Sequence, residues 1–241
     1  MAGSKVLVLG GTGPAGICLL RELLWRKHAV VAFARDPAKI PDDLMSNPLL
    51  KAIKGELSDK NALEAAVSEC SVVVSLLGPN TLRYINPATF TGFYETLFET
   101  MRTHGVRRIF AMSTLSYEQP NDRFSAIRWL LVALVFFVAH FGWRTARGIG
   151  RVFEEHAAGL DWTVFRIAGI EGGSDEDSWK TGREDGEVYE GWIGQMGWSA
   201  SQNRAALTRW LVDAVEDGKA QWIRKMPAVS RRAGGAKAEP S

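Results

Sequence analysis

The chain has 241 residues, which is enough for one large domain with a full hydrophobic core. Hydrophobic residues make up 46% and charged residues 23%, as in ordinary globular proteins, and the formal net charge is +2. So small a charge gives no long-range field that would recruit nucleic acid, and we expect no nucleic-acid partner. Two isolated cysteines, Cys18 and Cys70, are too few for a disulfide framework or a metal site.

The first residues run directly into the apolar stretch 6–9, without a charged region, an apolar core and a cleavage site in that order. Together with the few cysteines, this start favours a cytoplasmic protein.

Apolar runs bounded by turn residues alternate with segments of helical periodicity along most of the chain. The predicted strands are 6–9, 29–34, 50–54, 72–77, 108–112 and 162–167. The predicted helices are 17–25, 61–69, 89–104, 150–158 and 205–216. This alternation predicts an α/β fold, a Rossmann-type doubly wound parallel sheet covered on both faces.

Two segments lack this pattern. Residues 171–190 are rich in Gly, Asp and Glu, which indicates a mobile surface loop near a site or a solvated connection. Residues 228–241 hold too little apolar content to fold, so we expect a single domain over 1–227 and a disordered tail over 228–241.

One stretch is unusually apolar. Residues 129–143 carry no charged side chain and lie between Arg128 and Arg144. A bilayer-spanning helix needs about 20 apolar residues, so this run is too short to span. We expect it to be buried in the protein, to form a dimer contact or to sit in a membrane surface.

The strongest motif is the glycine loop Gly10-Gly11-Thr12-Gly13-Pro14-Ala15-Gly16, between the first predicted strand and the first predicted helix. A dinucleotide needs a tight turn there, a position without Cβ where the backbone meets the pyrophosphate, and close packing of helix on strand. We therefore expect Gly10, Thr12, Gly13, Pro14 and Gly16 to bind a dinucleotide at the helix N-terminus.

The residue after the second strand selects the cofactor, because an acid there binds the ribose hydroxyl whereas an arginine accommodates the extra phosphate. Arg35 occupies this place, which favours NADP(H); the alternative is that Asp36 binds the ribose of NAD(H). Leu57 follows the third strand, where an adenine pocket would lie. Leu77 and Gly78, at the end of the fourth strand, complete the expected cofactor site.

The chain resembles the atypical short-chain dehydrogenase/reductases, and within them the NmrA-like NAD(P)-binding proteins. The residues that carry the resemblance are 10–16, 34–37, 55–59, 113–114 and, most specifically, the stretch Gly159-Leu160-Asp161-Trp162-Thr163-Val164-Phe165-Arg166. The resemblance implies a Rossmann core with a small C-terminal substrate-binding part. The family includes quinone, flavin and phenylpropanoid reductases, isomerising enzymes and redox-sensing regulators, so membership does not fix the activity.

The sequence departs from standard short-chain reductases in lacking their Tyr-x-x-x-Lys pair. Tyr117 is followed four residues later by Asn121, and Tyr84 by Ala88. Many relatives also carry a lysine in the helix before the strand that begins near Leu160; it has no counterpart in this sequence, and the cations nearby are Arg144, Arg147 and Arg151. An arginine stays charged, so it cannot relay protons as a lysine can.

Ser113, Thr114 and Tyr117 remain as candidate catalytic residues, because they follow the fifth strand at the edge where open α/β sheets bind ligands. Ser113 and Thr114 could hydrogen-bond a substrate carbonyl and Tyr117 could donate a proton. The structural alternatives are a capping hydroxyl for Ser113 and a packed lid residue for Tyr117.

Aromatic residues are frequent beyond position 120, which favours an apolar substrate pocket. We therefore expect an NADP(H)-dependent oxidoreductase that acts on a hydrophobic carbonyl, enone or quinone-like small molecule. Two alternatives stay open: a non-redox isomerase or cyclase on the same fold, and a non-catalytic regulator that senses NADP(H).

Overall fold

The structure, a computed structural model, describes residues 5–78 and 86–234. An eight-stranded sheet with the order β3-β2-β1-β4-β5-β6-β10-β8 forms its centre. The strands are β1 (Lys5–Leu9), β2 (Val30–Ala34), β3 (Leu50–Lys54), β4 (Cys70–Ser75), β5 (Arg108–Thr114), β6 (Asp161–Ile167), β8 (Val188–Gly191) and β10 (Ala228–Arg231). Neighbouring strands pair in parallel, except that β8 runs antiparallel to β10.

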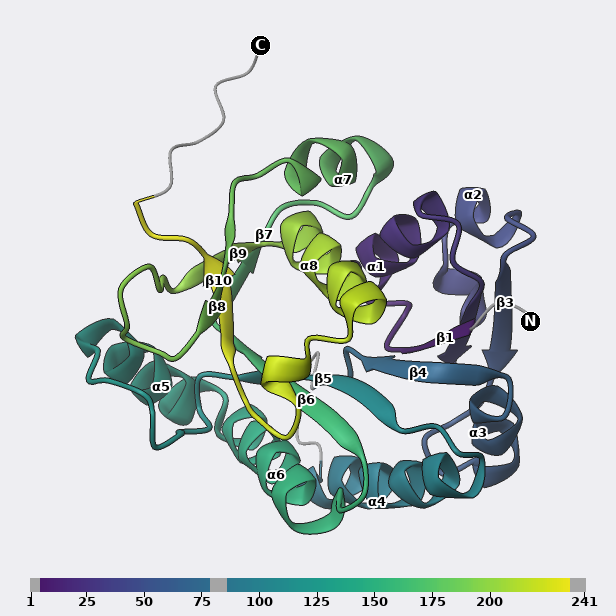
Figure 1. Ribbon diagram of the computed structural model, residues 1–241, viewed down its shortest axis with the longest axis horizontal. Helices are drawn as coiled ribbons and strands as arrows, with labels where there is room; N and C mark the ends of the chain where they lie inside the picture. Colours follow the sequence, from purple (N-terminus) through teal and green to yellow (C-terminus); the bar gives the residue numbers. More distant parts are fainter. Residues whose placement is uncertain (1–4, 79–85, 235–241) are drawn as a thin grey trace.

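Helices cover both faces of this sheet (Figure 1). On one face lie α1 (Pro14–Trp25) and α8 (Arg204–Asp217), which share a core with the sheet through Leu19, Leu23 and Leu211. On the other face lie α3 (Lys60–Val67), α4 (Pro87–Thr103) and α6 (His140–His156). The Rossmann-type doubly wound fold is thus confirmed, and its central strands β1, β2 and β4 are mostly apolar because both faces of the sheet are buried there.

The segment 171–190 is not the loop that its composition suggested. It contains α7 (Glu176–Arg183) and most of β8, and its first residue ends β7 (Gly169–Glu171), which pairs with β9 (Ser201–Asn203). The helix is held by Glu22, a fully buried carboxylate on α1 that accepts hydrogen bonds from Trp179 Nε1 at 3.1 Å and Arg183 Nη2 at 3.0 Å. This tertiary contact outweighs the poor local apolar content.

The expectation of a disordered tail from residue 228 is wrong for β10. Ala228 and Val229 are buried, and the strand pairs with β8 on one side and β6 on the other. Inserting between two strands satisfies its backbone, so the segment folds despite its short apolar stretch. Residues 235–241 lie outside the described part of the chain.

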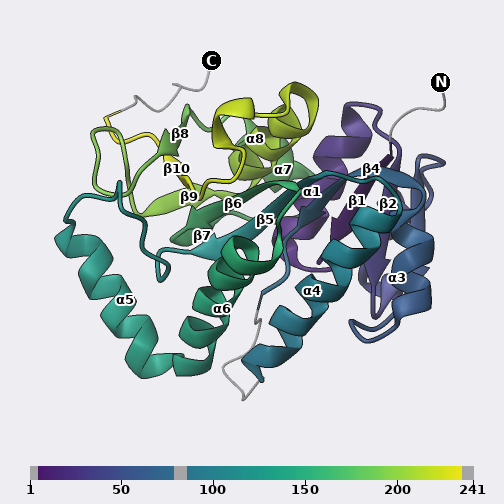
Figure 2. The ribbon, with the colours of Figure 1, turned by 60° about the horizontal axis from the view of Figure 1, so that its bottom comes forward.

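The apolar run 129–143 is divided between α5 (Ala126–Val138) and the first turn of α6. Ala139 separates the helices with φ −135° and ψ 50°, and α6 begins ten residues before the helix predicted at 150–158. No residue of α5 is buried, so the expectation that this part of the run is buried in the protein is wrong. Figure 2 shows α5 lying away from the sheet and meeting α6 in a V.

Within the described ranges 5–78 and 86–234, no single helix is both long and apolar enough to cross a membrane. Taken together, α5 and α6 have the length and the apolar composition of a membrane span, but the two helices are bent by 117° relative to each other.

The short elements α2 (Asp42–Met45), η1 (Pro37–Lys39) and η2 (Ala220–Trp222) complete the described chain.

Candidate functional site

The glycine loop joins β1 to α1, and two of its glycines are required by the protein itself. Gly10 has φ +82°, and a Cβ there would lie 2.9 Å from the Leu76 carbonyl oxygen. A Cβ on Gly16 would lie 2.2 Å from the Gly10 carbonyl oxygen. The first glycine makes the turn and the second lets the helix approach the strand, as a dinucleotide loop requires.

Gly13 differs from these two. Apart from its chain neighbours, the one heavy atom of the described residues within 4 Å of a Cβ built there is the Gly10 carbonyl oxygen, at an ordinary contact distance of 3.6 Å. Gly13 is the N-cap of α1, no side chain caps the helix, and Pro14 opens its first turn. The chain packing does not require glycine here, whereas a ligand on the open backbone and the first helical amides would.

Beyond the end of β2, Arg35 and Asp36 are both exposed. Within the described residues Arg35 makes no ion pair, whereas Asp36 lies 3.8 Å from the Lys39 ammonium. The arginine is therefore free to meet an anion, and the acid already faces a cation. Leu57, after β3, is partly buried against the core.

A cavity of about 440 Å³ opens at the carboxyl edge of the sheet, the same edge that carries the glycine loop. It brings together the predicted Leu77 and Gly78 after β4 with Ser113 and Thr114 at the end of β5. The other lining residues are Met112, Leu115, Ser116, Leu131, Val132, Val135, Ala139, Gly142, Ala146, Ile149, Ile167, Ala168 and Gly169. Ligands of open α/β sheets bind at this edge.

The cavity wall holds hydroxyl groups but, among its described residues, no ionisable side chain. Ser113 is buried and its Oγ donates to the Ala146 carbonyl oxygen at 3.2 Å. Thr114 is exposed and its Oγ1 accepts from the Ser116 N–H at 3.3 Å. The Thr114 hydroxyl proton therefore remains available to a ligand, whereas that of Ser113 is engaged.

Tyr117 does not line the cavity with Ser113 and Thr114. Its ring packs on α6, where a Cβ on Gly150 would lie 2.5 Å from it, and its hydroxyl donates to the Glu154 carboxylate. Burial, and then the Glu154 carboxylate, raise the pKa of Tyr117 to about 12. A phenol so placed is a poor proton donor near neutral pH. Tyr84 lies outside the described residues.

The arginines near the missing lysine's place also stay outside the cavity. The guanidinium of Arg147 lies 5.0 Å from the centre of the Trp143 ring and donates to the Ser116 carbonyl at 3.5 Å. Arg144 and Arg151 are exposed on α6. In ranges 5–78 and 86–234, no group of three His, Cys, Asp or Glu side chains could hold a metal ion.

The sequence did not predict that α5 and α6 form the outer wall of the cavity. Leu131, Val132 and Val135 reach it from α5, and Ala146 and Ile149 from α6. The spacing of the three α5 residues marks one helical face, but every neighbour is also apolar, so the periodicity is hidden.

The chain matches a family of NAD(P)H-binding proteins over residues 10–217. A 3β-hydroxysteroid dehydrogenase/Δ5→4-isomerase of Mycobacterium tuberculosis is 30% identical over 122 residues, 46% of this chain and 32% of that protein. An isoflavone reductase homologue of Zea mays is 37% identical over 83 residues, 31% of this chain and 26% of that protein. The chain thus spans about a third or less of these relatives.

Among solved structures, a wide-type short-chain dehydrogenase/reductase of Veillonella parvula in complex with NADP superposes with a TM-score of 0.70. The match covers 99% of each chain at 19% identity, so it shows the shared fold. The family match, which includes the glycine loop, places this chain in the NAD(P)H-binding family, and the chain shares its fold with a short-chain dehydrogenase/reductase.

Proposed function

We propose that this protein is an NADPH-dependent reductase of a hydrophobic carbonyl, enone or quinone-like small molecule. The cofactor would supply the hydride, and the protein would hold and orient the two reactants. The observation that carries the proposal is the cavity at the carboxyl edge of the sheet, which reaches from Gly78 to Thr114 and is otherwise almost entirely apolar.

The choice of NADP(H) rests on the charges beyond β2. Arg35 is exposed and unpaired within the described chain, while Asp36 faces Lys39 at 3.8 Å. A guanidinium there would bind the ribose phosphate of NADP(H) in two hydrogen bonds. Gly10, Thr12, Gly13 and the first amides of α1 would hold the pyrophosphate.

The substrate class rests on the lining of the cavity. Aliphatic side chains from β5, α5 and α6 favour an apolar ligand, because a sugar would leave its hydroxyls without partners there. The Thr114 hydroxyl would donate a hydrogen bond to the substrate oxygen. Ser113, beside it in the cavity wall, would help to position the substrate. Catalysis would then depend on orientation more than on a strong protein acid.

The NmrA-like regulators suggest a second candidate, a non-catalytic sensor of NADP(H). The absence of ionisable side chains from the described cavity wall favours it, since a sensor needs no proton donor. The same absence speaks against an isomerase or cyclase, whose reactions commonly need a protein acid or base.

We propose that the protein is cytoplasmic, because its two buried cysteines, Cys18 and Cys70, would persist there as the free thiols that the structure has.

A single assay separates these functions. Purified protein is mixed with NADPH and a set of apolar quinones, enones and aromatic ketones, and the nicotinamide absorbance and the organic products are followed together. A reductase consumes NADPH in proportion to the product. Conversion of a ligand at constant nicotinamide absorbance would indicate an isomerase, and NADPH binding without either change would indicate a sensor.

A further inference from the structure

The helix α5 exposes most of its apolar side chains. The exposed fraction is 69% for Trp129 and 82% for Phe137, and 87% for Phe124, just before the helix. The other apolar side chains of this surface that are more than half exposed are Ile127, Leu130, Leu134 and Val138. We call this set of seven residues the α5 patch. An apolar surface of this kind marks a contact with a protein, a membrane or a ligand.

Arginines flank the α5 patch in the sequence, and Glu118, the acid that lies beside the patch, is already paired with Arg128. Residues 123–153 contain five arginines and no Asp or Glu. Arg123 and Arg144 are exposed, and neither pairs with an acid among the described residues. The patch is therefore apolar at its centre and positive at both ends.

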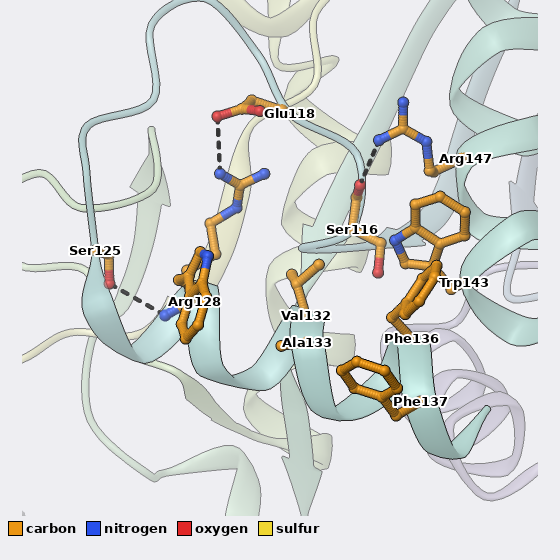
Figure 3. A pocket seen from close by; sticks show the side chains of 11 residues that line it. Ser116, Glu118, Ser125, Arg128, Val132, Ala133, Phe136, Phe137, Trp143 and Arg147 are labelled. Carbon is orange, nitrogen blue, oxygen red and sulfur yellow. Dashed lines mark hydrogen bonds and ion pairs between the residues drawn. The ribbon is translucent and has the colours of Figure 1, made fainter. Parts of the chain in front are cut away.

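Arg128 of α5 and Arg147 of α6 both bind the loop that follows β5 (Figure 3). Arg128 donates to the Leu115 carbonyl at 3.1 Å and pairs with Glu118 at 3.0 Å. Arg147 donates to the Ser116 carbonyl. The rings of Phe136 and Trp143 pack edge to face, with 5.1 Å between the ring centres. The helix is thus fixed on its inner side, and its outer side stays uncovered.

From this arrangement we propose that α5 docks in the surface of an anionic lipid bilayer, with its axis in the membrane plane. A helix of 13 residues is about 20 Å long, which is shorter than the roughly 30 Å hydrocarbon core. The apolar patch would enter the boundary between headgroups and acyl chains, and Arg123 and Arg144 would meet the lipid phosphates.

Charge distinguishes this partner from a second copy of the chain. Two copies that meet through the α5 patch would bring identical arginine groups together without an acid from the same segment to pair them. An anionic bilayer supplies the opposite charge over the whole rim. Complementary charge thus favours lipid over self-association.

Docking would set the cavity beside the membrane, because α5 contributes residues both to the cavity wall and to the α5 patch. Leu131, Val132 and Val135 line the cavity from the helix that carries the α5 patch. Apolar molecules dissolved in the bilayer would then enter the cavity next to α5. This consequence for the substrate rests on the proposed function, whereas the docking itself does not.

The test is sedimentation of the full chain with vesicles of phosphatidylcholine, alone or mixed with phosphatidylglycerol. We expect binding to the mixed vesicles that weakens in high salt. Arg123→Gln and Arg144→Gln should each weaken it about fivefold, and Phe137→Ser by about 10- to 100-fold. Met45→Ser, an exposed apolar position on α2, is the matched control and should bind as the unaltered protein does.

The same samples are followed by light scattering, circular dichroism and NADPH titration. Folded variants that bind NADPH but not vesicles separate a loss of docking from a failure of the cofactor proposal. Equal binding to both vesicle types, or no binding to either, would overturn the proposal. So would a dimer that Phe137→Ser dissociates while vesicle binding is absent, because the second copy would then cover α5.

Discussion

Arg166 and Asp122 form a buried, bidentate ion pair that connects β6 to the loop after β5. Their atoms meet at 2.6 Å (Nη1–Oδ2) and 2.8 Å (Nη2–Oδ1), and both side chains are almost fully inaccessible. Asp122 also accepts from the backbone N–H groups of Gln119 and Ile193. Arg166 donates a further hydrogen bond to the Met226 carbonyl at 2.8 Å. The pair thus connects β6 and the loop after β5 with the segments around Ile193 and Met226.

We expect Asp122→Asn to lower the free energy of unfolding by about 3–5 kcal/mol, because it leaves the Arg166 charge buried without its partner. Chemical unfolding followed by circular dichroism measures the change. The control is Glu118→Gln in the same loop, whose exposed pair with Arg128 should contribute at most about 1 kcal/mol.

The same pair predicts a pH dependence. Burial acts to raise the pKa of Asp122, but the hydrogen bonds and charge of Arg166 outweigh it, so the pKa lies below its ordinary value. The ionised carboxylate therefore stabilises the fold fully above about pH 4, and this stabilisation disappears as the pH falls through the lowered pKa. Unfolding curves at acidic pH should show a loss that Asp122→Asn lacks. Parallel pH dependences for the two proteins would contradict this account.

The glycine loop allows ligand binding and folding to be separated. Gly13→Val should cost only about 0.5–1 kcal/mol of stability, because its Cβ would meet the Gly10 carbonyl oxygen at an ordinary contact distance, yet it should abolish NADPH binding. Gly16→Ala places a methyl group against the Gly10 carbonyl and should destabilise the fold by about 1–3 kcal/mol or more. Thermal unfolding and NADPH titration of both variants give the comparison. A Gly13→Val protein that still bound NADPH tightly would show that the loop does not hold the pyrophosphate.

The hydroxyl groups at the site predict an order of effects on turnover. Thr114→Val should lower kcat on the order of 10²-fold, since it removes the free donor at the substrate oxygen. Tyr117→Phe should change kcat little, because its hydroxyl faces Glu154 instead of the cavity. Steady-state kinetics of both variants, with NADPH binding as the control, measure this order. A larger loss of kcat for Tyr117→Phe than for Thr114→Val would indicate that the Tyr117 phenol is the proton donor.

The sheet and the glycine loop could be predicted from the sequence because their signals are local. The central parallel strands are mostly apolar, and Gly10 and Gly16 stand where the backbone turns and packs closely. The edge that holds Leu77, Gly78, Ser113 and Thr114 follows from the strand order of a doubly wound sheet.

The remaining elements depend on contacts that a single segment does not contain. The helix α7 needs Glu22, more than 150 residues away in the chain, and β10 needs two partner strands. The direction of Tyr117 depends on the absence of a side chain at Gly150 and on the Glu154 carboxylate. Local composition and periodicity carry no information about such partners.

The most direct test of the account is the ratio of the NADPH and NADH dissociation constants, measured by titration for the protein and for Arg35→Asp. Loss of a charged hydrogen-bonding partner costs about 1.5–3 kcal/mol, so we expect a preference for NADPH of about 10- to 100-fold that Arg35→Asp abolishes or inverts. Arg107→Asp, an exposed arginine before β5 at the opposite edge of the sheet, should leave the ratio unchanged. Equal affinity for both cofactors in the unaltered protein, or tighter binding of NADH, would contradict the assignment of Arg35 to the ribose phosphate.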